Sequence, residues 1–124
     1  MDTTNASSGD GGRPRRIRRL VETALLMRLQ HEPAHGYGLM AALKTMGLEG
    51  YPMDSSAMYR VLRQLERGGA VVSAWHIESS AGPPRRVYRI TERGEKMLRA
   101  WLADLRATAH ALNALLAWYD KESN

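Results

Sequence analysis

The stretch from Asp54 to Gly69 restricts the fold more than any other part of the 124-residue chain. Its apolar residues recur at i, i+3, i+4 and i+7, which is the repeat of a helix with one buried face. These residues are Met58, Val61, Leu62 and Leu65. Asp54 is suited to cap the start of the helix, and the pair Gly68-Gly69 is suited to end it. We therefore expect a helix over residues 54–67 that packs on a core.

The other face of this expected helix is basic. It carries three arginines, a tyrosine and a serine without any acid, namely Ser56, Tyr59, Arg60, Arg63 and Arg67. Polar faces of helices usually do no more than meet the solvent. A face with several cations and no counter-charge is also suited to an anionic partner. The periodicity by itself leaves both interpretations open.

Two more helices are expected before this one, and a hairpin is expected after it. Residues 15–31 have a broad apolar face and stop before Pro33. A second apolar stripe consists of Leu39, Met40, Leu43 and Met46, with Gly47 as a C-cap. Residues 70–77 and 85–90 are rich in β-branched and aromatic side chains, so they predict two strands joined by a loop over 78–84. A hairpin this short must pack on the helices.

A long final helix is expected from Thr91 to about Tyr119. Its apolar residues follow spacings of three, four and seven over most of that length. Such a stripe is too long and too apolar for a lone surface helix, and a symmetric dimer is the economical way to cover it. The residues expected at the dimer interface are Leu98, Trp101, Leu102, Leu105, Leu112, Leu116 and Tyr119.

The charge of the chain is concentrated in two blocks. The formal net charge is +5 and the sequence pI is about 10.0, which favours a polyanionic partner. Residues 13–19 contain five arginines, and residues 85–99 contain six basic side chains against two acids. In the first block, Arg15 and Arg16 either form an arm that enters a minor groove or belong to a solvated helix start.

Several classes of protein are not expected from the composition. Without cysteine the chain has no disulfides, thiolate metal sites or cysteine nucleophile, which fits a reducing cytoplasm. No phosphate-binding glycine loop, metal-spaced histidine cluster or nucleophile beside a base points to an enzyme, a cofactor or a metal. No apolar run approaches the roughly 20 residues of a membrane span. Residues 1–12 are polar and glycine-rich, so we expect a disordered tail and no signal peptide.

The order of the expected elements is that of a winged helix-turn-helix, mainly α with a small β-hairpin. A helix fits the major groove of duplex DNA, where the base edges differ, while arginines on helix and hairpin hold phosphates. We expect the helix over 54–67 to read DNA, and Arg85 and Arg86 to contact the backbone or the minor groove. A winged-helix module that binds protein and not DNA is the alternative. RNA binding is disfavoured because stacking aromatics on an open sheet are missing.

Three motifs resemble the PadR-like family of transcriptional regulators. They are H-G-Y-G-L at 35–39, M-Y-R-V-L-R-Q-L-E-R-G-G at 58–69 and G-P-P-R-R-V-Y-R-I-T-E-R-G at 82–94, and the resemblance covers about residues 24–119. It implies a winged-helix domain, a long C-terminal helix that builds a homodimer, and a repressor that a small molecule releases. It also implies an aromatic effector held between the dimer and DNA-binding parts, for which Trp101 is a candidate, although a tryptophan at helical spacing is more often a core residue.

The resemblance also assigns roles by matching position. It marks Ser55, Ser56 and Tyr59 as DNA contacts and Arg86 and Tyr88 as wing residues, while strand alternation favours an inward Tyr88. The family commonly has Pro-Gly-Thr or Pro-Gly-Ser at 54–56 and a proline at position 60. Here Asp-Ser-Ser and an arginine stand at those positions, which keeps the capping chemistry and changes the surface that meets the bases.

Two further expectations concern the second helix and the domain boundaries. Gly36 is expected to permit a tight start of the second helix, and Tyr37 to pack against that helix. The chain should divide into a tail over 1–12 and a winged helix-turn-helix with a basic N-terminal arm over 13–90. A dimerisation helix over 91–119 and a tail over 120–124 complete the expected organisation.

Overall fold

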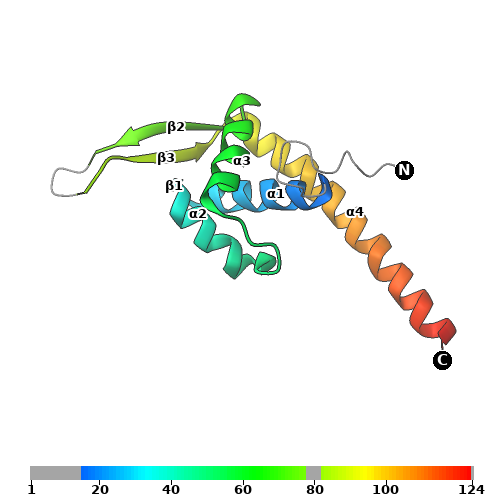
Figure 1. Cartoon of the computed structure of the whole chain (residues 1–124). Coiled ribbons are helices and arrows are strands. Elements are labelled where there is room, and N and C mark those ends of the chain that lie inside the picture. Colours follow the sequence, from blue (N-terminus) through cyan, green and yellow to red (C-terminus); the bar gives the residue numbers. More distant parts are fainter. Residues whose placement is uncertain (1–14, 78–81, 124) are drawn as a thin grey trace, which may run out of the picture.

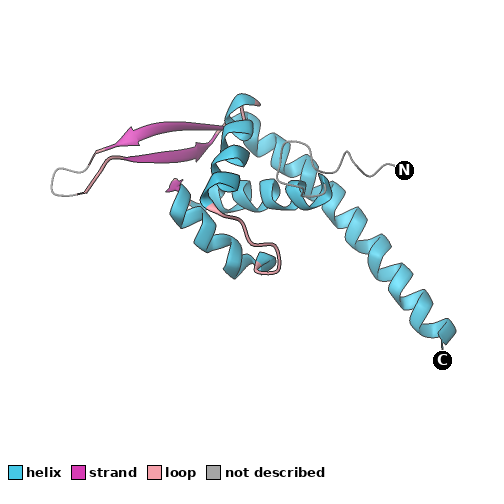
Figure 2. Cartoon of the chain, viewed as in Figure 1, coloured by secondary structure: helices cyan, strands magenta, loops and turns pink. Residues whose placement is uncertain are grey.

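The computed structural model describes residues 15–77 and 82–123 of the chain. The expected tail over residues 1–12 and the tip of the expected loop at 78–81 lie outside the described residues. The described part is mainly helical with one small sheet, as the sequence predicts (Figure 2). The hairpin extends from one side of the helical body, and the far end of the last helix extends from the other (Figure 1).

Helices α1 (Arg15–His31), α2 (Gly36–Leu43) and α3 (Ser55–Arg67) surround a single core. Each presents the apolar face that its sequence period predicts, because residues three and four apart fall on one side of a helix. The largest fully buried side chains are Leu25, Leu26, Leu39, Met58, Leu62, Leu98, Val21 and Val71. The three expected helices are therefore confirmed, and α3 is held against the body by one face.

Helix α2 ends in a short π-helical turn, η2 (Lys44–Leu48). Gly47 lies within this turn at φ 98°, a left-handed conformation that glycine adopts without steric cost. The helical path of α2 stops there, close to the end that the sequence predicts. The chain then crosses to the start of α3 through residues 49–54.

The sheet has three strands in the order β1-β3-β2. Strands β2 (Val71–His76) and β3 (Arg85–Ile90) form the expected antiparallel hairpin, with Trp75 opposite Arg86. Strand β1 (Ala34–His35) pairs with β3 and was not expected. Two residues are too few to show an alternating pattern, so this strand exists only through its pairing with β3.

Helix α4 (Glu92–Ser123) begins immediately after β3. The Thr91 hydroxyl accepts a hydrogen bond from the Gly94 N–H at 2.9 Å, and it donates to the Gly69 carbonyl at 2.6 Å. This residue therefore caps α4 and ties it to the turn between α3 and β2. Leu98, two turns further on, is 1% exposed and belongs to the core.

The position of Leu98 corrects two sequence expectations. Because its own chain already covers it, Leu98 is not available to a dimer partner. The first turns of α4 therefore belong to the winged-helix body, and the domain boundary expected at residue 91 is wrong. Residues 120–123 are helical and not a tail, since α4 meets no helix-breaking residue before Ser123. From residue 106 onward, every described residue of α4 is exposed.

Candidate nucleic-acid interface

Helix α3 is capped as its sequence predicts. Asp54 has extended backbone angles, and its carboxylate accepts a hydrogen bond from the Ala57 N–H at 2.8 Å. The helix ends at Gly68, whose carbonyl accepts a hydrogen bond from Nε of Arg93 at 2.9 Å. Both ends are thus satisfied, and the buried apolar face fixes which side of α3 faces outward.

The outward side of α3 carries Ser56, Arg60, Arg63 and Arg67, which we call the arginine stripe. Their spacing of four, three and four residues places them in one line along the helix. Ser56, Arg63 and Arg67 are exposed, and Arg60 is half-buried at the flank that faces α1. Within the described residues, the three arginines form no ion pair and no hydrogen bond. Neighbouring cations at these spacings repel one another by a few tenths of a kcal/mol, which an anion in front of them would relieve.

Two other expected contact residues lie beside the stripe. Ser55 is exposed at the start of α3, and Tyr59 is half-buried against α2. A Cβ atom on Gly36 would lie 2.5 Å from the hydroxyl oxygen of Tyr59. Gly36 therefore allows the close approach of Tyr59, a contact that the sequence did not predict, and the expected role of Gly36 in a tight helix start stays a prediction. The expectation that Tyr37 packs against its helix is wrong, because Tyr37 is 69% exposed and the buried side of α2 is the one that bears Gly36 and Leu39.

The hairpin of β2 and β3 is the wing, and its arginines Arg85 and Arg86 form hydrogen bonds with different partners. Nη1 of Arg85 lies 3.0 Å from Nε2 of His35, whose Nδ1 lies 3.4 Å from the Gly38 N–H. A neutral imidazole has one acceptor nitrogen, so His35 accepts from Gly38 or from Arg85 but not from both in one tautomer. Nε of Arg86 donates a hydrogen bond to Oγ of Ser73 at 3.0 Å. Arg85 is exposed and Arg86 is half-buried.

Tyr88 points inward, as strand alternation favours. It is 3% exposed and belongs to the core. Burial raises the pKa of its hydroxyl above the usual value near 10, against a smaller opposite effect from the charge of Arg86. Tyr88 therefore supports the base of the wing and does not present its ring to a ligand.

The first turn of α1 contains Arg15 and Arg16, both exposed. Both residues are helical, as in the second interpretation, a helix start, and their contact with a minor groove stays a prediction. Arg13 lies outside the described residues. No acid stands in this first turn, although the N-terminus of a helix favours negative charge. Arg19 is compensated, since Nε donates to Oε1 of Glu22 at 3.0 Å and the guanidinium carbon lies 4.0 Å from the ring centroid of Trp101.

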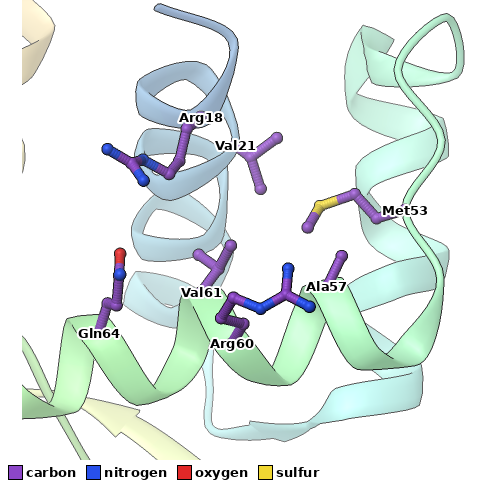
Figure 3. A pocket seen from close by; sticks show the side chains of 7 residues that line it. All are labelled: Arg18, Val21, Met53, Ala57, Arg60, Val61 and Gln64. Atoms are coloured by element: carbon purple, nitrogen blue, oxygen red, sulfur yellow. The ribbon is translucent and has the colours of Figure 1, made fainter. Parts of the chain in front are cut away.

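A small hollow lies at the flank of α3 that faces α1 (Figure 3). Arg60 lies over it from α3, and Arg18 of α1 and Gln64 of α3 lie together on one side of it (Figure 3). Its volume is about 10 Å³, which is close to the space of one water molecule. This hollow is too small for an effector.

A larger groove of about 380 Å³ lies between α1 and α4. Trp101 lines it together with apolar residues of both helices, while Arg16, Arg19 and Asp104 add charge. Tyr51, from the segment that leads into α3, also lines this groove. Trp101 is half-buried in this groove, and its expected role in an effector pocket stays a prediction.

Comparison with known proteins decides the class of this arrangement. The family model described as the transcriptional regulator PadR-like family matches residues 25–100. The chain belongs to the PadR-like family of transcriptional regulators. No curated protein sequence matches the chain. Members of this family regulate transcription and are not enzymes, so the chain is a transcription regulator.

Solved structures of PadR-like and other regulators have the same fold. A PadR family transcriptional regulator from Eggerthella lenta is 31% identical, with a TM-score of 0.63 over 82% of this chain and 86% of that one. A transcriptional regulator from Clostridium thermocellum is 25% identical, with a TM-score of 0.71 over 82% and 97%. A PadR family regulator from Clostridium difficile is 20% identical, with a TM-score of 0.68 over 77% and 97%.

The far half of α4 in this PadR-like chain carries an exposed apolar face. Its five large side chains are each between 55 and 66% exposed: Leu112, Leu115, Leu116, Trp118 and Tyr119. Nearer the body, the expected interface residues Trp101, Leu102 and Leu105 are half-buried. Leu115 and Trp118 were not among the expected interface residues, although Leu115 follows the same helical spacing.

No helix in residues 15–77 and 82–123 is both long and apolar enough to cross a membrane. In the same residues, no group of three or more histidines and carboxylates is placed to hold a metal ion.

Two polar residues that are linked to the wing arginine Arg86, one directly and one through the other, were not predicted from the sequence. Ser73 of β2 and Glu66 of α3 join Arg86 in a row of hydrogen bonds. Glu66 is the only acid on α3, and this isolated negative charge among arginines could have marked it as a residue with a specific partner. Through its hydrogen bonds with Ser73, the Glu66 carboxylate is held toward β2.

Proposed function

We propose that this regulator is a homodimeric repressor that binds duplex DNA through α3 and the wing, acts in the cytoplasm and is released by a small molecule. The observation that carries the proposal is the uncompensated arginine stripe. Three cations in one line, without an acid paired to them in the described residues, are suited to the edges and phosphates of a major groove. The exposed Arg85 and the half-buried Arg86 extend the basic surface along the wing.

Duplex binding is tested with the full chain and fluorescently labelled DNA. Anisotropy should report binding of a random duplex at low salt and tighter binding of duplexes selected from a random pool. The logarithm of the association constant should fall by about 0.9 per decade of salt for each phosphate neutralised. If neither random nor selected duplexes bind at low salt, the DNA-binding proposal is wrong and the protein-binding alternative gains support.

The role of α3 is tested by matched arginine substitutions. Arg60→Ala and Arg63→Ala should each weaken binding of a selected duplex, by roughly 5- to 100-fold where the arginine contacts a base. Arg106→Ala on the exposed part of α4 is the control and should have little effect. Equal and negligible losses for all three variants would contradict a DNA-reading role of α3.

The homodimer is supported by the exposed face of α4. Five large apolar side chains in one segment form the kind of patch that marks a partner surface, and a second copy of the same face is the simplest partner. Sedimentation at micromolar concentration should therefore give twice the monomer mass of 13.9 kDa. Leu112→Glu with Leu116→Glu should give a folded monomer, and a wild type that sediments as a stable monomer would contradict the dimer.

Effector release is supported by the groove between α1 and α4. Trp101, Leu105 and Leu112 line it, and the same three residues belong to the expected dimer surface. A ligand in this groove would therefore change contacts that the dimer also uses. Small aromatic compounds that quench Trp101 fluorescence should also lower DNA affinity, and Trp101→Phe should remove both effects. Quenching without a change in DNA affinity would count against effector release.

A further inference from the structure

Three side chains from three elements form a hydrogen-bonded row between α3 and the wing. Both carboxylate oxygens of Glu66 lie within 3.0 Å of Oγ of Ser73, at 3.0 and 2.9 Å. Oγ of Ser73 in turn accepts from Nε of Arg86 at 3.0 Å. A serine hydroxyl has one hydrogen to donate and two lone pairs to accept with, so it can serve both neighbours at once. The row therefore links an acid on α3 to a cation on β3.

The guanidinium group of Arg86 also forms a cation–π contact. The guanidinium carbon of Arg86 lies 5.2 Å from the ring centroid of Trp75, its direct partner across the two strands. Such contacts between a cation and an aromatic ring stabilise the arginine where it lies. Trp75 is 63% exposed, so this arrangement is at the surface of the wing. In the described residues, the hydrogen bonds of Arg86 use Nε alone, which leaves both terminal nitrogens to donate to a ligand.

From these contacts we propose that Ser73 and Glu66 are positioning residues that hold Arg86 ready for a DNA phosphate and fix the wing relative to α3. This inference rests on the proposed DNA binding and extends it to residues that need not touch DNA. A free arginine side chain loses much rotamer freedom when it binds. Here that freedom is already restricted before DNA arrives, because Nε is bonded and the ring of Trp75 covers one face.

The row also explains how an acid can be placed on α3. A free carboxylate next to the arginine stripe would repel phosphates. Because Glu66 accepts from Ser73, its charge is turned toward β2 and is used to orient the wing.

The first test needs no DNA. In a ¹H–¹⁵N spectrum of the full chain, the Arg86 Nε–H signal should be protected from exchange with water, because this hydrogen is bonded to Ser73. Ser73→Ala should remove the protection, and Ser73→Thr should keep it. Thr45→Ala removes a hydroxyl from the surface of η2 and is the control. An unprotected Arg86 signal in the wild type would overturn the positioning role even if the protein binds DNA.

The second test measures DNA affinity across a range of salt concentrations. Arg86→Ala should lower the salt slope by about 0.9, the value for one lost phosphate contact. Ser73→Ala should weaken binding about 3- to 10-fold and leave the slope unchanged, because the charge of Arg86 remains but is no longer held. In the Arg86→Ala background, Ser73→Ala should have no further effect, and Ser73→Thr should restore wild-type affinity.

The outcomes separate the two proposals. An unchanged salt slope in Arg86→Ala would show that Arg86 does not neutralise a phosphate, and it would overturn this inference while the α3 proposal stands. Equal losses from Ser73→Ala with and without Arg86 would show that Ser73 acts only on the fold. If the wild type binds no duplex at low salt, the proposed function fails and this inference fails with it, whatever the Arg86 signal shows.

Discussion

At Gly94, helix α4 packs closely against Ala70 and Ile90. The substitution Gly94→Ala tests how much this close packing contributes to stability. A Cβ atom at this position would overlap the carbonyl oxygen of Ala70 and would lie 2.9 Å from Cγ1 of Ile90. The Ala70 carbonyl has little freedom to move, because it accepts a hydrogen bond from the backbone N–H of Thr91 at 3.0 Å and lies 3.1 Å from the Thr91 hydroxyl oxygen, whose single hydrogen is shared with the nearer Gly69 carbonyl.

The expected loss of stability follows from three effects. Inserting a methyl group into a filled site costs about 1–3 kcal/mol. Displacing the Ala70 carbonyl weakens a hydrogen bond with a net value of about 1 kcal/mol. Alanine is a better helix former than glycine by about 1 kcal/mol, which offsets part of the loss. We therefore expect the free energy of unfolding to fall by about 2 kcal/mol, or the melting temperature by roughly 8 °C.

The measurement is thermal and urea unfolding followed by circular dichroism. Protein concentration is held constant, because the melting temperature of a dimer depends on it. Gly50→Ala is the control, since a Cβ atom there would meet no atom within 4 Å. It should leave the melting temperature unchanged or raise it slightly. A Gly94→Ala protein as stable as the wild type would refute the argument that this contact fixes α4.

Three further predictions concern single side chains. Thr91→Val should lower the free energy of unfolding by about 1–2 kcal/mol, because the cap of α4 is lost, and Thr91→Ser should retain most of it in the same urea titration. As the pH rises above about 10, the unfolded chain loses the Tyr88 proton first, so stability should fall by up to about 1.4 kcal/mol per pH unit. Tyr88→Phe should remove that part of the decline in urea titrations at pH 9 to 11. Gly36→Ala should destabilise the fold, and Tyr59→Phe in the same chain should restore part of the loss in a double-mutant cycle.

The elements that the sequence predicts well are those with several turns or alternations. Helix α3 has four apolar residues in register and a capping aspartate, so both its limits and its buried face follow from local rules. Strand β1 has only two residues, and its pairing with β3 depends on a contact across more than fifty positions. The exposure of Tyr37 was not predictable for a different reason. The buried side of a short helix depends on the elements that pack against it, and the local sequence does not identify them.

Helix α4 and the wing show where periodicity is ambiguous. Leu98 and Leu112 are two members of one repeat, yet the first is covered by its own chain and the second is exposed. A repeat indicates that a residue will be covered, but it does not indicate by which chain. The basic residues of the wing were predicted from composition. The hydrogen bond from Arg86 to Ser73 follows from strand register, which the loop over 78–84 leaves undetermined in the sequence.

The length and phase of α4 have a consequence for operator architecture. Its 32 residues span about 48 Å, and the start is tied through Thr91 to the turn between α3 and β2, while the far half carries the exposed apolar face. Inserting one residue in the exposed part would rotate that face by about 100° around the helix axis. Removing seven residues would keep the phase nearly constant and shorten the helix by roughly 10 Å. In the proposed dimer, the number of residues in α4 would therefore set the distance between the two winged-helix domains, and with it the spacing of the DNA half-sites that they bind.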